Sequence, residues 1–199
     1  MARRARFVCG AIAAVLSLAH AVGAQDFVFG VRGGGTATRQ FTRAGYTAFE
    51  HGSTRGLAGA MAMKPWLAFS LEILVVDKGR LPSQTRPHRY FEVPYMARVG
   101  LPWQFMGVRP YAALGAAYAY ELSCDTACAS ADRVTTDFSV VSAWGATLTK
   151  GRLELALEHR RTRGQHTVDR RPDRHATNDM RSLLLRLSLV LPGIVPDWM

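Results

Sequence analysis

The sequence lacks a long apolar run and has few cysteines. Its 199 residues are 48% hydrophobic, 20% charged and 10% aromatic, with three cysteines. Beyond residue 24, the longest stretch without Asp, Glu, Lys or Arg is 138–149, which is 12 residues, whereas a membrane-spanning helix needs about 17–25. This excludes a helical membrane protein for that part of the chain. The apolar fraction excludes a disordered polar chain, and the length predicts about one domain.

The first 24 residues contain no acidic residue and have the pattern of a secretory signal peptide. Three arginines (Arg3, Arg4 and Arg6) precede an uncharged stretch of 13 residues, 7–19, and Val22-Gly23-Ala24 offers small residues for cleavage before Gln25. An uncleaved membrane anchor is the alternative. Cleavage would lower the formal net charge of +10 by the three arginines and would also remove Cys9. We therefore expect a signal peptide at 1–24 and a protein that is exported.

Strict alternation of apolar and polar residues recurs along the rest of the chain, and helical periodicity is hard to find. Leucines at 153, 155 and 157 alternate with Glu154, Ala156 and Glu158, and the run 183–191 has leucine at every second position. A period of two predicts β-strands. The candidates are eight, near 26–35, 53–64, 66–78, 89–101, 108–121, 137–149, 152–162 and 179–191. Most reach the ~9–11 residues with which a tilted strand crosses a bilayer.

The predicted connections alternate between short and long. The short ones lie at 64–65, 102–107 and 150–151, and the long ones at 36–52, 79–88, 122–136 and 163–178. This pattern is typical of bacterial outer-membrane barrels, whose short turns face the periplasm. The sequence therefore predicts an all-β fold, an eight-stranded antiparallel up-and-down transmembrane β-barrel over 25–191, with long extracellular loops and a short tail at 192–199.

The two faces of these strands differ in composition. One carries the leucines, and the other carries small residues with a few charges, which suits the narrow interior of an eight-stranded barrel. Aromatic residues near the short turns predict an interfacial girdle (Trp66, Tyr95, Trp103, Phe105 and Tyr111). A soluble secreted barrel with its leucines turned inward is the alternative.

The predicted interior face carries four acidic and four basic residues. Because an isolated buried ion costs several kcal/mol, a balanced set is what a closed lumen requires. We expect these side chains to form a structural charge network, and an ion path is the alternative. The set is Arg32, Glu72, Glu92, Arg98, Glu154, Glu158, Arg160 and Arg186.

Several segments together resemble the PorT-like outer-membrane β-barrel family and, more loosely, the small OmpA/OmpX-type barrels. They are 30–34 (GVRGG), 71–74 (LEIL) with 78–79 (KG), 90–94 (YFEVP), 109–111 (RPY) with Gly115, and the closing run 182–191. The resemblance implies an eight-stranded barrel in the outer membrane of a Gram-negative bacterium, inserted by the barrel-assembly machinery. It does not imply one activity, because a fold does not fix a function.

No arrangement for catalysis, cofactor binding or metal binding emerges from the sequence. His51 and Ser53 are close in sequence, but His51 falls in a predicted long loop, and alternation sends Glu158 and His159 to opposite faces. The prediction is a non-catalytic barrel with a structural, adhesive or envelope-stabilising role through its surface loops, without cofactor or nucleic-acid partner. A lipid A-modifying enzyme of deacylase or acyltransferase type is the alternative, and narrow-pore transport is a third hypothesis.

Cys124 and Cys128 are the two cysteines left after cleavage at residue 24. They lie in one predicted long loop of a protein expected in an oxidising compartment. We expect a disulfide between them. A metal site is the alternative, but two thiols alone do not complete a tetrahedral site.

Between residues 160 and 181 the chain has seven arginines against three aspartates. The planar fork of arginine suits phosphate, and the outer leaflet around such a barrel is rich in phosphorylated lipopolysaccharide. The sequence therefore predicts outer-membrane lipid and lipopolysaccharide as partners, contacted by Arg161, Arg163 and Arg181. A solvated loop whose arginines pair with its own aspartates is the alternative.

Overall fold

A computed structural model of the chain describes residues 26–42, 45–46, 49–78, 89–123, 135–165 and 177–192. The strands are β1 (Asp26–Thr42), β2 (Gly45–Tyr46), β3 (Glu50–Lys64), β4 (Leu67–Asp77), β5 (Arg89–Gly100), β6 (Val108–Ser123), β7 (Thr136–Lys150), β8 (Leu153–Gly164) and β9 (Thr177–Pro192). Within these ranges there is no helix long and apolar enough to cross a membrane. The predicted signal peptide at 1–24 and both loop cysteines, Cys124 and Cys128, lie outside the described residues.

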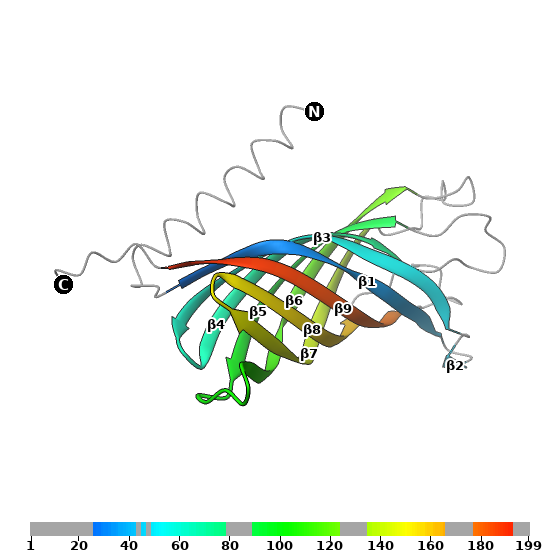
Figure 1. Cartoon of the computed structure of the whole chain (residues 1–199). Helices are drawn as coiled ribbons and strands as arrows, with labels where there is room; N and C mark the ends of the chain where they lie inside the picture. The colour runs from blue at the N-terminus through cyan, green and yellow to red at the C-terminus, as the bar shows by residue number, and fades with distance from the viewer. Residues whose placement is uncertain are drawn as a thin grey trace, which may run out of the picture.

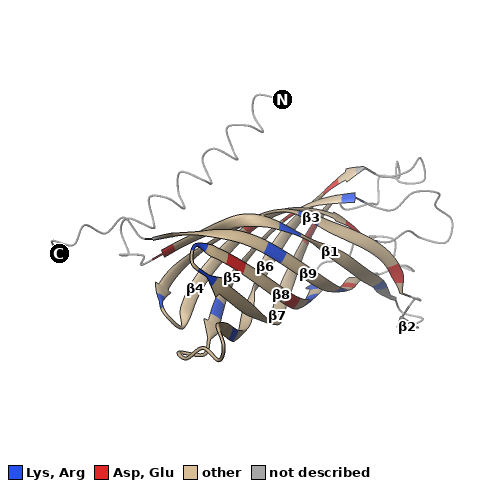
Figure 2. Ribbon diagram, viewed as in Figure 1, with Lys and Arg blue, Asp and Glu red and all other residues tan. Residues whose placement is uncertain are grey.

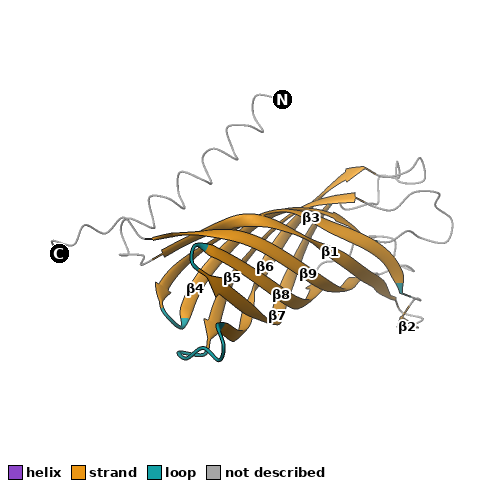
Figure 3. Ribbon diagram, in the orientation of Figure 1, coloured by secondary structure: helices purple, strands orange, loops and turns teal. Residues whose placement is uncertain are grey.

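Eight long strands form a closed antiparallel barrel (Figure 1). Each strand pairs with its neighbour along the chain, and β1 pairs with β9 to close the ring, while the two-residue β2 pairs only with the end of β1. The start of β1 and the end of β9 meet at one end of the barrel, at the pair Asp26 and Pro192. The short turns lie at this same end (Figure 3). The predicted fold class is confirmed.

Several strand boundaries differ from the sequence-based prediction, the end of the first strand by seven residues and the others by one to three. The first strand extends to Thr42 instead of residue 35, because alternation continues through Thr36 and Thr38, which point inward and are buried. His51, expected in a long loop, consequently lies in β3 opposite Ala37. Pro192, assigned to the tail, is the last residue of β9.

The leucines of the strands face outward. On β9, the exposed fractions of Leu183, Leu185, Leu187, Leu189 and Leu191 lie between 50% and 58%, whereas the alternate positions Leu184, Arg186 and Ser188 are buried. The same parity holds on β8, where Leu155 is exposed and Ala156 is buried. The apolar residues of these two strands therefore form the outer wall, and the barrel core contains small and polar side chains, as in a membrane barrel.

Neighbouring glycines on β1 give a test of how tightly the inner wall is packed. A Cβ atom on Gly34, which faces the lumen, would lie 2.0 Å from the carbonyl oxygen of Leu183, whereas no described atom lies within 4 Å of a Cβ on Gly35. The atom that this Cβ would meet belongs to the backbone of β9, which cannot move aside as a side chain can. We therefore expect Gly34→Ala to lower the free energy of unfolding by about 1–3 kcal/mol. Gly35→Ala should change it by less than about 0.5 kcal/mol. Urea titration of the folded fraction, read from the gel mobility of unboiled protein, measures both, and equal stabilities would contradict this packing.

Candidate functional site

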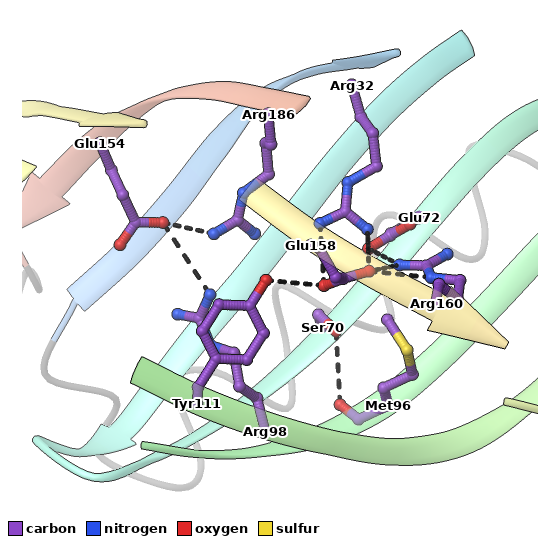
Figure 4. A network of polar contacts seen from close by, with 10 residues as sticks. All are labelled: Arg32, Ser70, Glu72, Met96, Arg98, Tyr111, Glu154, Glu158, Arg160 and Arg186. Atoms are coloured by element: carbon purple, nitrogen blue, oxygen red, sulfur yellow. Dashed lines mark hydrogen bonds and ion pairs between the residues drawn. The ribbon is translucent and has the colours of Figure 1, made fainter. Parts of the chain in front are cut away.

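The eight charged residues predicted for the interior lie on the lumen side of the wall. Seven of them are buried and Arg98 is half-buried. Figure 2 shows that charged positions lie within the strands and not only at their ends. The close-up in Figure 4 shows most of these side chains converging inside the barrel.

The central part of this network joins opposite sides of the ring. Arg32 of β1 donates to Glu72 of β4 at 2.6 Å and to Glu158 of β8 at 3.0 Å. Arg160 of β8 donates to the same Glu72 at 2.9 Å and pairs with Glu158 at 2.8 Å. Since β4 and β8 lie four strands apart in a ring of eight, these contacts cross the whole lumen. We refer to Arg32, Glu72, Glu158 and Arg160 as the central quartet.

A second cluster lies on the short-turn side of the quartet. Arg186 pairs with Glu154, and Arg98 lies 3.9 Å from the same carboxylate. Tyr111 joins the two clusters, because its hydroxyl donates to Glu158 at 2.7 Å and its ring lies 4.9 Å from the guanidinium carbon of Arg98. The prediction of Tyr111 in an outer aromatic girdle was therefore wrong. It has the inward parity of Ala113 and Ala117 and is buried as they are.

A third cluster lies nearer the long loops and includes two residues that sequence reasoning missed. Lys78 lies 3.1 Å from Glu92 and 3.6 Å from Asp137, and Asn178 donates to Asp137 at 3.2 Å. Lys78 continues the inward parity of β4, and Asp137 has the inward parity of the small residues of β7. Both are terminal residues of the predicted strands 66–78 and 137–149, so applying the same parity to the strand ends would have identified them.

A cavity of about 260 Å³ opens at the short-turn end of the barrel. Tyr111, Arg98 and Glu154 contribute to its lining, so the second cluster bounds it on the lumen side. Its volume is below the ~300–1,000 Å³ of pockets that enclose drug-sized ligands.

The arginines predicted to contact lipopolysaccharide lie on the outer face of the wall. Arg161 and Arg163 are on β8, and Arg181 is opposite Arg161 on β9. The structure adds Arg39, which the prediction did not contain, and it pairs Arg161 with Asp179, one of the three aspartates counted between residues 160 and 181. Asp179 of β9 accepts hydrogen bonds from Arg161 at 3.0 and 3.1 Å and from Arg39 of β1 at 3.1 and 2.9 Å.

We call the outward-facing leucines of β8 and β9, Leu153 to Leu157 and Leu183 to Leu191, the leucine band. Asp179 lies beyond this band on β9, on its long-loop side. Its carboxylate lies between the guanidinium groups of Arg161 and Arg39, which both donate to it.

No metal-binding arrangement occurs among the residues that the structure describes. They include no group of three or more His, Cys, Asp or Glu placed to hold a metal ion. Glu158 points into the lumen, whereas the ring of His159 lies on the other face, 5.3 Å from that of Trp144. Ser53 donates to Asp77 at 2.9 Å on the exposed side of the wall.

Comparison with solved structures places the fold among small outer-membrane β-barrels. Neisserial surface protein A is similar with a TM-score of 0.53 at 14% identity, covering 80% of this chain and 96% of that protein. The outer membrane protein OprG from Pseudomonas aeruginosa is similar with a TM-score of 0.51 at 10% identity, covering 85% and 97%. At these identities the similarity concerns the fold alone. No protein-family model and no curated protein matches the sequence, so the PorT-like resemblance stays a prediction.

Proposed function

We propose that this protein is a non-catalytic outer-membrane barrel whose role is structural, adhesive or envelope-stabilising and depends on its outer wall and surface loops. The observation that carries the proposal is the closed lumen. Glu72 and Arg160 join opposite strands at 2.9 Å, and clusters of paired charges lie on both sides of them. In a barrel filled in this way, the interior side chains serve to stabilise the fold. The role of the protein then depends on its outer wall and its surface loops.

The wall supports the assignment to the outer membrane. Nine residues from Leu183 to Leu191 span about 26 Å along a strand at ~3.3 Å per residue. With a tilt of ~35–45° this leucine band covers about 20 Å of bilayer, close to the ~25 Å apolar band of outer-membrane barrels. The proposal includes export by the signal peptide at 1–24, insertion by the barrel-assembly machinery, and a disulfide between Cys124 and Cys128.

The proposed partner at the outer leaflet is lipopolysaccharide, contacted by Arg161, Arg163 and Arg181. What supports it is that all three side chains leave the strands on the lipid side, next to the leucine band, instead of entering the lumen. The solvated-loop alternative predicts that these arginines pair with aspartates of the same segment, as Arg161 does with Asp179, but both of these residues lie in strands and not in a loop.

Planar-bilayer recording and lipid A analysis test the proposed function. Heat-modifiable, folded protein should insert without producing stable unit conductance, because the central quartet and its neighbouring clusters fill the lumen. The mass spectrum of lipid A should be the same from cells with and without the protein. Reproducible conductance steps would support transport, and a protein-dependent change in lipid A acylation would support the enzyme alternative; either contradicts the proposal.

A further inference from the structure

Four outward-facing arginines gather on three neighbouring strands at the long-loop end of the wall. In the sheet register, Asp179 of β9 lies between Arg39 of β1 and Arg163 of β8, and Arg181 of β9 lies beside Arg161 of β8. We call this group, Arg39, Arg161, Arg163 and Arg181 with Asp179, the arginine face. The strands bring together residues that are up to 142 positions apart in the chain.

The arginine face lies at the edge of the leucine band. Arg181 is followed on the same face of β9 by Leu183, and Arg161 is separated from Leu157 on β8 only by His159. If the leucines occupy the hydrocarbon layer, the guanidinium groups lie at the height of the lipid headgroups. A ligand bound there can place acyl chains against the leucines and its polar head against the arginines.

Asp179 organises the face without neutralising it. Its carboxylate holds Arg39 and Arg161 through the hydrogen bonds described above. Counted over the described residues of this face alone, four arginines and one aspartate carry a formal charge of +3. Phe49 adds a second constraint, since the guanidinium carbons of Arg39 and Arg181 lie 4.9 and 5.7 Å from its ring centre. Side chains on three strands and the segment before β3 are thus held with an excess of positive charge facing the membrane.

Phosphate is the ligand group that fits this arrangement best. A guanidinium group donates two parallel hydrogen bonds to a phosphate, and a cluster with an excess charge of +3 favours an anion with more than one charge. A soluble polyanion would use the charges but leave the adjoining leucines without a partner. A phosphorylated glycolipid of the outer leaflet uses both.

We propose that the arginine face binds the phosphate groups of outer-leaflet lipopolysaccharide and replaces divalent cations there. Phosphates of neighbouring lipids repel one another and need counter-ions in order to pack. Fixed guanidinium groups supply that charge from the protein, so the lipid next to this face stays bound when divalent ions are removed. This inference rests on the proposed function, because it requires the barrel to lie in the outer membrane.

The test measures lipopolysaccharide retained by the purified full-length barrel after washing with EDTA, at low and high salt. The probes are deep-rough lipopolysaccharide and the same material after dephosphorylation. The variant is Arg163→Gln with Arg181→Gln, which leaves both partners of Asp179 in place. The matched control is Lys150→Gln with Arg152→Gln, which removes the same charge from exposed positions at the opposite end of β7 and β8.

Wild type and control are expected to retain phosphorylated lipopolysaccharide in EDTA and to lose it as salt screens the charges. The variant should retain about 25-fold less, since each of the two arginines near an anionic lipid surface contributes roughly a factor of five. Dephosphorylated lipopolysaccharide should bind wild type and variant equally weakly. Should the double variant fail to fold, Arg181→Gln alone takes its place.

Four results would overturn the inference. The first is equal retention of lipopolysaccharide by the variant and wild type, and the second is a loss in the control as large as that in the variant. The third is loss of lipopolysaccharide from wild type in EDTA at low salt. The fourth is that the same arginines capture a soluble sulfated polysaccharide, used as an additional probe, more strongly than lipopolysaccharide. Gel mobility before and after boiling separates this failure from that of the proposed function. A wild-type protein without a heat-modifiable form contradicts the barrel assignment, whereas folded proteins with equal retention contradict only the arginine face.

Discussion

Replacing Glu158 by leucine is expected to destabilise the barrel by about 3–5 kcal/mol, which is the usual cost of breaking a buried ion pair from one side. Glu158 accepts hydrogen bonds from Arg32, Arg160 and Tyr111. Its removal leaves two buried guanidinium groups with Glu72 as their shared carboxylate partner in the quartet. Urea titration in lipid vesicles, with the folded fraction read from gel mobility, gives the difference.

An exposed ion pair provides the control. Arg89 and Asp77 lie at the long-loop ends of β5 and β4, 2.9 Å apart, and the side chain of Arg89 is 45% exposed. Asp77→Asn should therefore cost less than about 1 kcal/mol. Glu158→Gln, which keeps the shape and an acceptor for Tyr111, should fall between the two. If Glu158→Leu costs no more than Asp77→Asn, the central quartet does not support the barrel in the way described.

Replacing Leu155 by arginine is expected to impair insertion, at a cost of about 2–4 kcal/mol. Leu155 lies on the outer face of β8, two residues from Leu153 and two from Leu157, in the leucine band. A cation at this depth on the lipid side of a barrel loses its hydration without gaining a partner. The fraction of protein that acquires the heat-modifiable form in vesicles measures the effect.

The adjacent residue tests the opposite face. Ala156 is 1% exposed and points into the lumen, where a serine hydroxyl has polar neighbours. Ala156→Ser should insert like wild type. Equal insertion of Leu155→Arg and wild type would mean that the wall does not face lipid, and would favour a soluble barrel.

The fold was predictable from the sequence because the two faces of a barrel wall have different surroundings. The outer face requires apolar residues, and the inner face carries small and polar ones. Leucine at every second position from 183 to 191 gives the strand, its length and its facing at once. Parity also placed Arg32, Glu72 and Arg160 on one face, and all three are buried. Parity can be read from the order of residues within one strand, and it does not require knowing which strands lie opposite each other.

The pairings inside the lumen were not predictable in this way. Arg160 meets Glu72, 88 residues away, because the ring places β4 across from β8 at matching heights. That height depends on the stagger between successive strands, which alternation does not encode. The same reason explains the arginine face, since Arg39 and Asp179 become neighbours only when β1 meets β9. For Tyr111, nearness to a short turn predicts a place in the outer girdle, whereas its parity puts the ring in the lumen, and the parity holds.

The seam between β1 and β9 is the longest in the barrel, with 16 register pairs from Asp26 with Pro192 to Phe41 with Thr177. It joins the first and the last strand, so every intermediate in which β9 is not yet docked has two unsatisfied sheet edges. Such edges attract other chains. If this seam forms last, the largest set of backbone pairs between two described strands is gained in the final step of folding. Closure is then close to all-or-none, and a folding helper has one defined task, which is to shield two strand edges until β9 docks.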